Sequence, residues 1–196
     1  MRHLTTAKIA SLLAAAAGEE AEECCRHLAE VCPDCGERLA EVEALMKRFR
    51  HWNPEVVVVE GLVADGLLDA LLATDPASWA AQVEEETDFQ TWGVAWVALE
   101  RARAILDQGE SQALDLALLA AKIAGHLGTM YHPEWVADLK ALSHATAALA
   151  IPPSNAEARL REMGAATAAL REGTGDEAVN REVVELLARV FSTTDR

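Results

Sequence analysis

Apolar residues recur along this chain with the period of an α-helix. Positions three or four apart lie on the same side of a helix, so a repeat of this kind predicts a buried helical face. Three such faces are Trp92, Trp96, Leu99 and Ala102; then Leu114, Ala117, Leu118 and Ala121, with Leu127 in the turn that follows; and later Ala166, Ala169 and Leu170. β-branched runs are few apart from Val56 to Val59, and Ala and Leu dominate the apolar residues. Because Ala, Leu, Glu and Arg lose little on entering a helix, we predict an all-α protein.

Helix start and stop signals divide the chain into segments. In a capping box, a short polar side chain accepts a hydrogen bond from the amide three residues on, and a Glu or Gln reaches back. Four segments fit this box: 34–37, 87–90, 154–157 and 174–177. Pro54, Pro76 and Pro133 suit the first position of a helix, where the missing N–H costs nothing, and Gly109, Gly128 and Gly173 suit helix ends.

The resulting helix starts in the second half are regularly spaced. They fall near residues 88, 110, 133, 155 and 177. We therefore expect helices of about 18 residues joined by short turns, and hairpins repeating about every 45 residues. Residues 87–196 resemble a tetratricopeptide-like α-solenoid, although the period exceeds the 34 residues of a standard repeat and the consensus is not met. The alternative is a helical bundle whose helices have similar lengths.

Residues 53–86 connect this array to the N-terminal region. Pro54 to Thr74 predicts one amphipathic helix, in which Asp65 and Asp69 lie off the apolar stripe. The stripe consists of Val59, Leu62, Val63, Leu67, Ala70 and Leu71. Gly61 and Gly66 lower the helix propensity, so we expect this helix to dock either on the array or on a partner.

Charge is unevenly distributed along the chain. The net charge is −15, and residues 51–100 hold 10 acidic residues but no Lys or Arg. We call this stretch the acidic belt. It repels phosphate backbones, so direct nucleic-acid binding is disfavoured, whereas a basic protein surface is attracted. The alternative is a solvated face that keeps the protein in solution.

Nothing in the sequence predicts a membrane segment or an exported protein. The most apolar stretch, 113–125, is too short for a membrane span and contains Asp115 and Lys122. The N-terminus lacks the regions of a signal peptide. All four cysteines lie between positions 24 and 35, whereas a secreted disulfide scaffold spreads them along the chain. We expect a cytoplasmic, metal-binding protein.

The candidate metal ligands are His27, Cys32 and Cys35. The Cys-x-x-Cys spacing lets two thiolates reach one ion from a tight turn, and His27 lies near the end of the preceding predicted helix (Glu19 to about Val31). Thiolate and imidazole suit tetrahedral Zn²⁺, and a structural site needs a fourth ligand. Both His3 and Cys24 are candidates, whereas Cys25 points elsewhere on the helix. The alternatives to zinc are inert buried thiols or a redox pair, although a thioredoxin-like motif needs a βαβ context.

A family resemblance supports the zinc site. The segment from His3-Leu4-Thr5 through His27-Leu28 to Cys32-Pro33-Asp34-Cys35 resembles the zinc-binding anti-sigma domain, over residues 1 to about 50. In that family an upstream His or Cys precedes His-x3-Cys-x2-Cys, which opens a third helix. The resemblance implies a three-helix domain over residues 1–52 with a structural zinc held by His3, His27, Cys32 and Cys35. This chain has four residues, not three, between His27 and Cys32.

The remaining residues suggest no catalysis. His51, His126, His132 and His144 have no metal-site spacing, and no nucleophile elbow, phosphate loop or paired-carboxylate cleft is present. A catalytic zinc needs an open position and a nearby base, and Glu30 is more simply a surface residue. The five Trp are core anchors by the simplest interpretation, although Trp79, Trp92 and Trp96 also suit a binding groove. We expect a protein that is not an enzyme.

The anti-sigma resemblance implies a soluble regulator that sequesters a sigma factor, or a similar transcription partner, through its N-terminal zinc domain. The alternative is an adaptor whose helical array recruits another protein complex, with the zinc module purely structural. The sequence leaves open the partner's identity, the releasing signal and the oligomeric state.

Overall fold

The described part of the chain is helical. The computed structural model describes residues 5–7, 9–10, 32–49, 53–108, 111–129 and 131–192. Within these ranges the regular structure consists of α-helices and short 3₁₀ turns, with no strand, so the all-α prediction is confirmed. None of the helices in these ranges is both long and apolar enough to cross a membrane. The chain divides into two compact units, Met1–Asp65 and Gly66–Arg196, which are described separately.

The first unit is built around α3 (Pro33–Phe49) and α4 (Pro54–Gly61), which pack on each other. Ile9, Ala10, Val42 and Val58 form its buried cluster, with Leu39, Leu45 and Met46 packed against them. Asn53 Oδ1 accepts from the Val56 amide at 3.4 Å and caps α4, whose first residue is a proline as predicted.

The predicted continuous helix from Pro54 to Thr74 is wrong, because α4 ends at Gly61 and α5 (Ala64–Leu72) begins after a turn. The buried Phe49 ring lies against Gly61, where a Cβ would be 2.7 Å from Phe49 Cε2. The glycine lets the ring approach the end of α4 closely. The break between α4 and α5 shifts the helical register. An apolar stripe predicted for one continuous helix therefore does not match the buried residues of the two helices.

Burial in this segment therefore differs from the predicted stripe. Of the predicted stripe residues, Leu71 is fully buried, but Val59, Leu62 and Val63 are 66%, 60% and 50% exposed. The buried apolar residues are instead Val57, Val58, Ala64, Leu68 and Leu71. The boundary between the two units lies between Asp65 and Gly66. It therefore falls within α5 and within the predicted connecting segment, residues 53–86.

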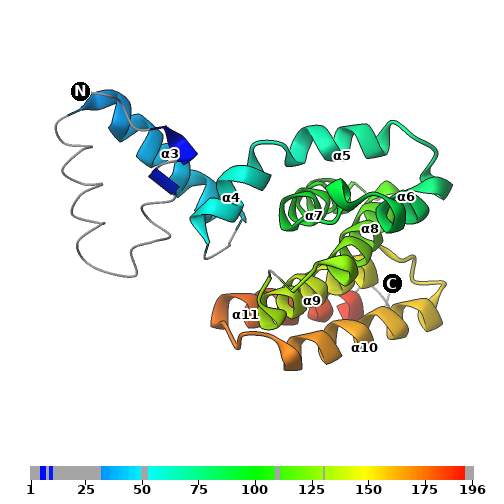
Figure 1. Ribbon diagram of the computed structural model, residues 1–196. Coiled ribbons are helices and arrows are strands. Elements are labelled where there is room, and N and C mark those ends of the chain that lie inside the picture. The colour runs from blue at the N-terminus through cyan, green and yellow to red at the C-terminus, as the bar shows by residue number, and fades with distance from the viewer. Residues whose placement is uncertain are drawn as a thin grey trace. The chain divides into compact units, whose positions relative to one another are not determined.

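The second unit continues with short elements and then five long helices. The short elements are η1 (Pro76–Ser78), α6 (Trp79–Glu85) and η2 (Thr87–Phe89), and the long helices are α7 (Trp92–Leu106), α8 (Gln112–His126), α9 (Pro133–Ala150), α10 (Ala156–Glu172) and α11 (Glu177–Ser192). Consecutive long helices pack on one another, and α9 also packs on α7 and α11 (Figure 1). Helix α9 is accordingly buried along most of its circumference.

Small side chains permit this packing. Ala102 of α7, Leu116 and Ala117 of α8 and Ala147 of α9 form one buried cluster. The predicted face of α7 is buried as expected, whereas the predicted face of α8 is rotated: Ala117 is buried but Leu118 is 38% exposed. Helices α7 and α9 lie against the side of α8 that carries Leu116, Ala120 and Ile123, and this packing sets the buried face.

Local signals set the starts of these helices, with three corrections. Residues 87–89 form a 3₁₀ turn, and α7 begins at Trp92 with Thr91 Oγ1 accepting from the Val94 amide at 3.3 Å. Asn155, not Ser154, caps α10, and Asp176, not Thr174, caps α11 by accepting from the amides of residues 178 and 179. The predicted starts of α9 and α11, at 133 and 177, are confirmed.

Candidate metal centre and neighbouring surfaces

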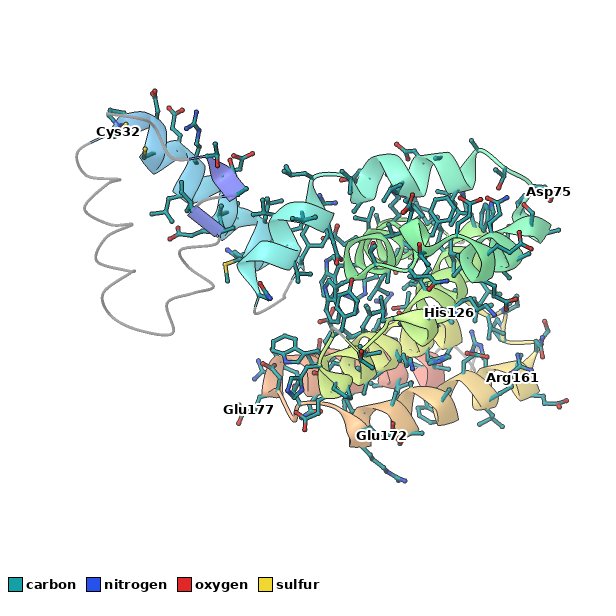
Figure 2. All side chains as sticks on the ribbon, viewed as in Figure 1. Cys32, Asp75, His126, Arg161, Glu172 and Glu177 are labelled. Atoms are coloured by element: carbon teal, nitrogen blue, oxygen red, sulfur yellow. The ribbon has the colours of Figure 1, made fainter. Side chains whose placement is uncertain are left out.

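Cys32 directly precedes α3, and Cys35 lies in the first turn of this helix. Pro33 is the first residue of this helix, and the Cys32 carbonyl accepts from the amides of Cys35 and Gly36, both at 3.1 Å. The Cys35 side chain is buried at 4% exposure, and Cys32, labelled in Figure 2, is half-buried at the start of the helix. Asp34 lies inside the first turn, so the predicted capping role of this residue is wrong.

This turn supplies two of the four predicted ligands. Two thiols on one tight turn are the usual half of a tetrahedral zinc site, so the donor set fits that ion. His3 and His27, like the rival Cys24, lie outside the described residues. Among the residues that the structure describes, no group of three His, Cys, Asp or Glu side chains is placed to hold a metal. The four-ligand centre therefore stays a prediction.

Asp138 forms a buried polar contact that sequence reasoning missed. Its carboxylate accepts from Thr174 Oγ1 at 2.6 Å and from the Thr174 amide at 3.3 Å, which fixes the α10–α11 turn against α9. Burial raises the pKa of Asp138 above its ordinary value, and the two hydrogen bonds from Thr174 oppose this shift. At Gly173 a Cβ would lie 2.0 Å from Asp138 Oδ1, so only glycine permits the approach.

Two further buried polar side chains lie between the last three helices. Glu162 of α10 contacts His144 Nδ1 of α9 at 2.8 Å and accepts from Arg161 Nε at 3.2 Å. Arg159 donates to the carbonyls of Ile151 and Val190, at 2.7 and 3.4 Å. The His144–Glu162 contact joins α9 to α10, which indicates a structural role for His144.

The aromatic residues divide between core and groove. Trp92 stacks on Trp96 and on Tyr131, with ring centroids 6.3 and 6.4 Å apart, and all three side chains are buried. These two tryptophans are therefore core residues. Trp79 is the predicted groove candidate that borders a cavity.

That cavity, of about 290 Å³, lies between α6 and α8, and we call it the α6–α8 groove. Its lining residues are Pro76, Trp79, Ala80, Asp115, Leu118, Leu119 and Lys122. No sequence motif marks this groove, because α6 and α8 are separated by the whole of α7. Of the lining residues, Trp79 is predicted from the sequence as a groove candidate, whereas the apolar pattern places Leu118 in the core.

Most of the acidic side chains of the belt that the structure describes are exposed. Cations from outside the belt form ion pairs with it, among them Arg48 with Asp65 at 3.1 Å, Arg101 with Asp69 at 2.5 Å, and Lys122 with Glu84. Exposed carboxylates also line residues 75–88, at Asp75, Glu85, Glu86 and Asp88. The belt thus presents negative charge beside the α6–α8 groove.

Comparison with family models, with curated proteins and with solved structures gave no match. The function is therefore argued from the residues of this chain.

Proposed function

We propose that this chain is an anti-sigma-like regulator that sequesters a sigma factor, or a similar transcription partner, through a zinc-stabilised helical domain. The observation that carries the proposal is the Cys32–Cys35 turn at the start of α3, with one thiol buried and the other half-buried. A thiol pair at the opening of the third helix matches the position of the knuckle in the zinc-binding anti-sigma domain, which residues 1 to about 50 resemble.

In this proposal the zinc is structural. His3 and His27 complete the tetrahedral set with Cys32 and Cys35, and a closed set of four ligands leaves no open position for catalysis. Such an ion stabilises a small domain whose apolar core is limited. The protein is accordingly not an enzyme, and it acts in the cytoplasm, where sigma factors are found.

The acidic belt supports a protein partner with a basic surface. Sigma-factor surfaces that face DNA and polymerase are partly basic, and exposed carboxylates steer such surfaces toward the belt. The second unit serves as a tetratricopeptide-like array in this proposal, supported by the packing of α7 on α8, of α8 on α9 and of α9 on α10, whereas α11 packs mainly on α9.

Metal analysis tests the zinc site. The purified full-length protein is expected to carry about one zinc per chain, and Cys35→Ser is expected to lower both the metal content and the melting temperature. Cys25→Ser is the matched control, because Cys25 belongs to the same cysteine cluster but not to the proposed ligand set. Comparing His3→Ala with Cys24→Ser identifies the fourth ligand. Metal-free wild-type protein with the same melting curve as Cys35→Ser contradicts the site.

Binding to a sigma factor tests the function itself. The sigma factor encoded next to the gene of this protein is the first partner to examine, since anti-sigma genes usually lie beside their sigma gene. We expect a stable complex on size-exclusion chromatography that is lost when a chelator removes the zinc. A zinc-loaded protein that binds no sigma factor from its own genome contradicts the anti-sigma function.

An adaptor is the second candidate function. It is favoured by the separate compactness of the second unit, which has its own buried cluster and an open groove. In this case the zinc domain is only structural, and a partner stays bound to the Cys32→Ser, Cys35→Ser double variant. Loss of every partner in that variant contradicts the adaptor function.

A further inference from the structure

The α6–α8 groove has an apolar lining and the size of a side-chain pocket. Its volume of about 290 Å³ is at the lower limit of small-molecule sites, which begin near 300 Å³. The polar side chains that line it are Asp115 and Lys122, too few to orient a polar cofactor. Leu118 stands 38% exposed at this groove. An apolar side chain or two from a partner would fill the space and cover Leu118.

Hydrogen bonds hold the α6 wall in place. Trp79 Nε1 donates to the Thr74 carbonyl at 3.3 Å, and Gln82 Nε2 donates to Thr74 Oγ1 at 3.0 Å and to Ser78 Oγ at 2.8 Å. The ion pair between Glu84 and Lys122 ties this wall to α8. A preformed groove loses little conformational freedom when a partner binds, which favours affinity.

The charge around the groove selects the partner. Asp115 lines the groove, and the adjoining segment 75–88 carries exposed carboxylates and no Lys or Arg. Lys122, the cation among the lining residues, is ion-paired with Glu84, and this pairing holds the pKa of Glu84 below its ordinary value. An acidic partner is repelled at this surface, whereas a basic one is attracted.

From these observations we infer that the α6–α8 groove binds an amphipathic helix of a partner protein, with an apolar anchor in the cavity and Lys or Arg residues beside the carboxylates. Both walls of the groove are helices, and an amphipathic helix placed in such a groove presents anchors at positions i, i+3, i+4 and i+7. This inference specifies the partner of the adaptor function and rests on it, but it does not depend on zinc.

Peptide selection tests the groove directly. Helix-biased peptides of about 18 residues, or five turns, are displayed on phage and selected on the full-length protein, with Leu118→Asp as the counter-target. Leu118 is already partly exposed, so a charge there is expected to leave the fold intact, as circular dichroism checks. Ala80→Glu, an exposed position on the opposite wall, is a second blocking variant. Leu160→Asp, at a leucine of α10 that is 65% exposed, is the matched control.

The expected outcome is enrichment of peptides with several Lys or Arg residues around apolar anchors. They bind the wild type and Leu160→Asp alike, bind Leu118→Asp and Ala80→Glu at least about tenfold more weakly, and lose affinity as salt rises. Enrichment of acidic or neutral peptides, equal binding to the blocking variants, or no enrichment at all overturns the inference. Binding retained by Cys35→Ser separates this result from the zinc proposal.

Discussion

Single polar side chains fix the last two helices of the second unit against α9. Asp138 holds the α10–α11 turn through Thr174, and Glu162 contacts His144. A buried carboxylate with hydrogen-bond partners is costly to disturb, because removal of one partner leaves the other without compensation for its lost hydration. Both contacts specify how α9, α10 and α11 fit together.

The raised pKa of Asp138 makes its contribution to stability depend on pH. An acid whose pKa is higher in the folded state stabilises the fold below its ordinary value of 3.8, and this stability is lost as pH rises through the folded-state pKa. Asp138→Asn keeps the shape but cannot ionise. Urea unfolding from pH 4 to pH 7 should therefore show the wild type losing stability relative to Asp138→Asn as pH rises. The exposed Glu185→Gln serves as control, and a difference independent of pH contradicts the assignment.

Gly173 and Gly164 predict opposite effects of the same substitution. Gly173→Ala places a methyl group against Asp138 Oδ1 and is expected to cost about 1–3 kcal/mol in unfolding free energy. At Gly164, inside α10, an added Cβ would meet nothing within 4 Å, and Gly164→Ala is expected to add about 0.5–1 kcal/mol to the unfolding free energy through higher helix propensity. Chemical denaturation of both variants measures the contrast. Equal effects of the two substitutions contradict the close contact at Gly173.

At the scale of elements, the cap of α7 lies at Thr91 and not at Thr87. Thr91→Ala removes the acceptor for the Val94 amide and is expected to destabilise the second unit by about 1 kcal/mol. Thr87→Ala affects only a short 3₁₀ turn and should change stability by less than about 0.5 kcal/mol. Thermal unfolding of the two variants shows which threonine caps α7. A larger loss of stability in Thr87→Ala than in Thr91→Ala contradicts the cap at Thr91.

The sequence predicts local features of this protein better than distant ones. Helices α10 and α11 begin after Asn155 and Asp176, whose side chains cap the next amides, and α9 begins at Pro133, whose ring suits the first helical position. Because these signals are local, the sequence predicts the three starts to within two residues. The close contact of Phe49 with Gly61, where α4 ends, joins residues twelve positions apart, and a periodicity analysis does not detect such a contact.

The candidate sites also differ in whether they depend on local or on distant residues. The Cys32–Cys35 pair can be recognised in the sequence because its two residues are only three positions apart. The contacts of Asp138 with Thr174 and of His144 with Glu162 join residues 36 and 18 positions apart, and no pattern in the sequence links them. The outward position of Leu118 is set by packing of α7 and α9 on α8, which is likewise non-local.

At the scale of the whole molecule, the two compact units predict two responses to metal removal. The proposed zinc ligands all belong to Met1–Asp65, whereas four of the five Trp belong to Gly66–Arg196. In a Trp52→Phe variant, tryptophan fluorescence therefore reports on the second unit alone. A chelator is expected to lower the helical circular dichroism while leaving the fluorescence melting curve unchanged. Parallel shifts of both signals would show that the units unfold as one.

The packing of helix α9 limits how the sequence of this protein can change during evolution. Because its small side chains touch helices on several sides, a larger residue there must displace more than one neighbour, and substitutions are restricted to residues of similar volume. The exposed carboxylates at Asp75, Glu85, Glu86 and Asp88, and the exposed Leu118 of α8, carry no such restriction. Descendants of this chain can therefore change partners by altering the groove and its charges, while an unaltered α9 preserves the scaffold.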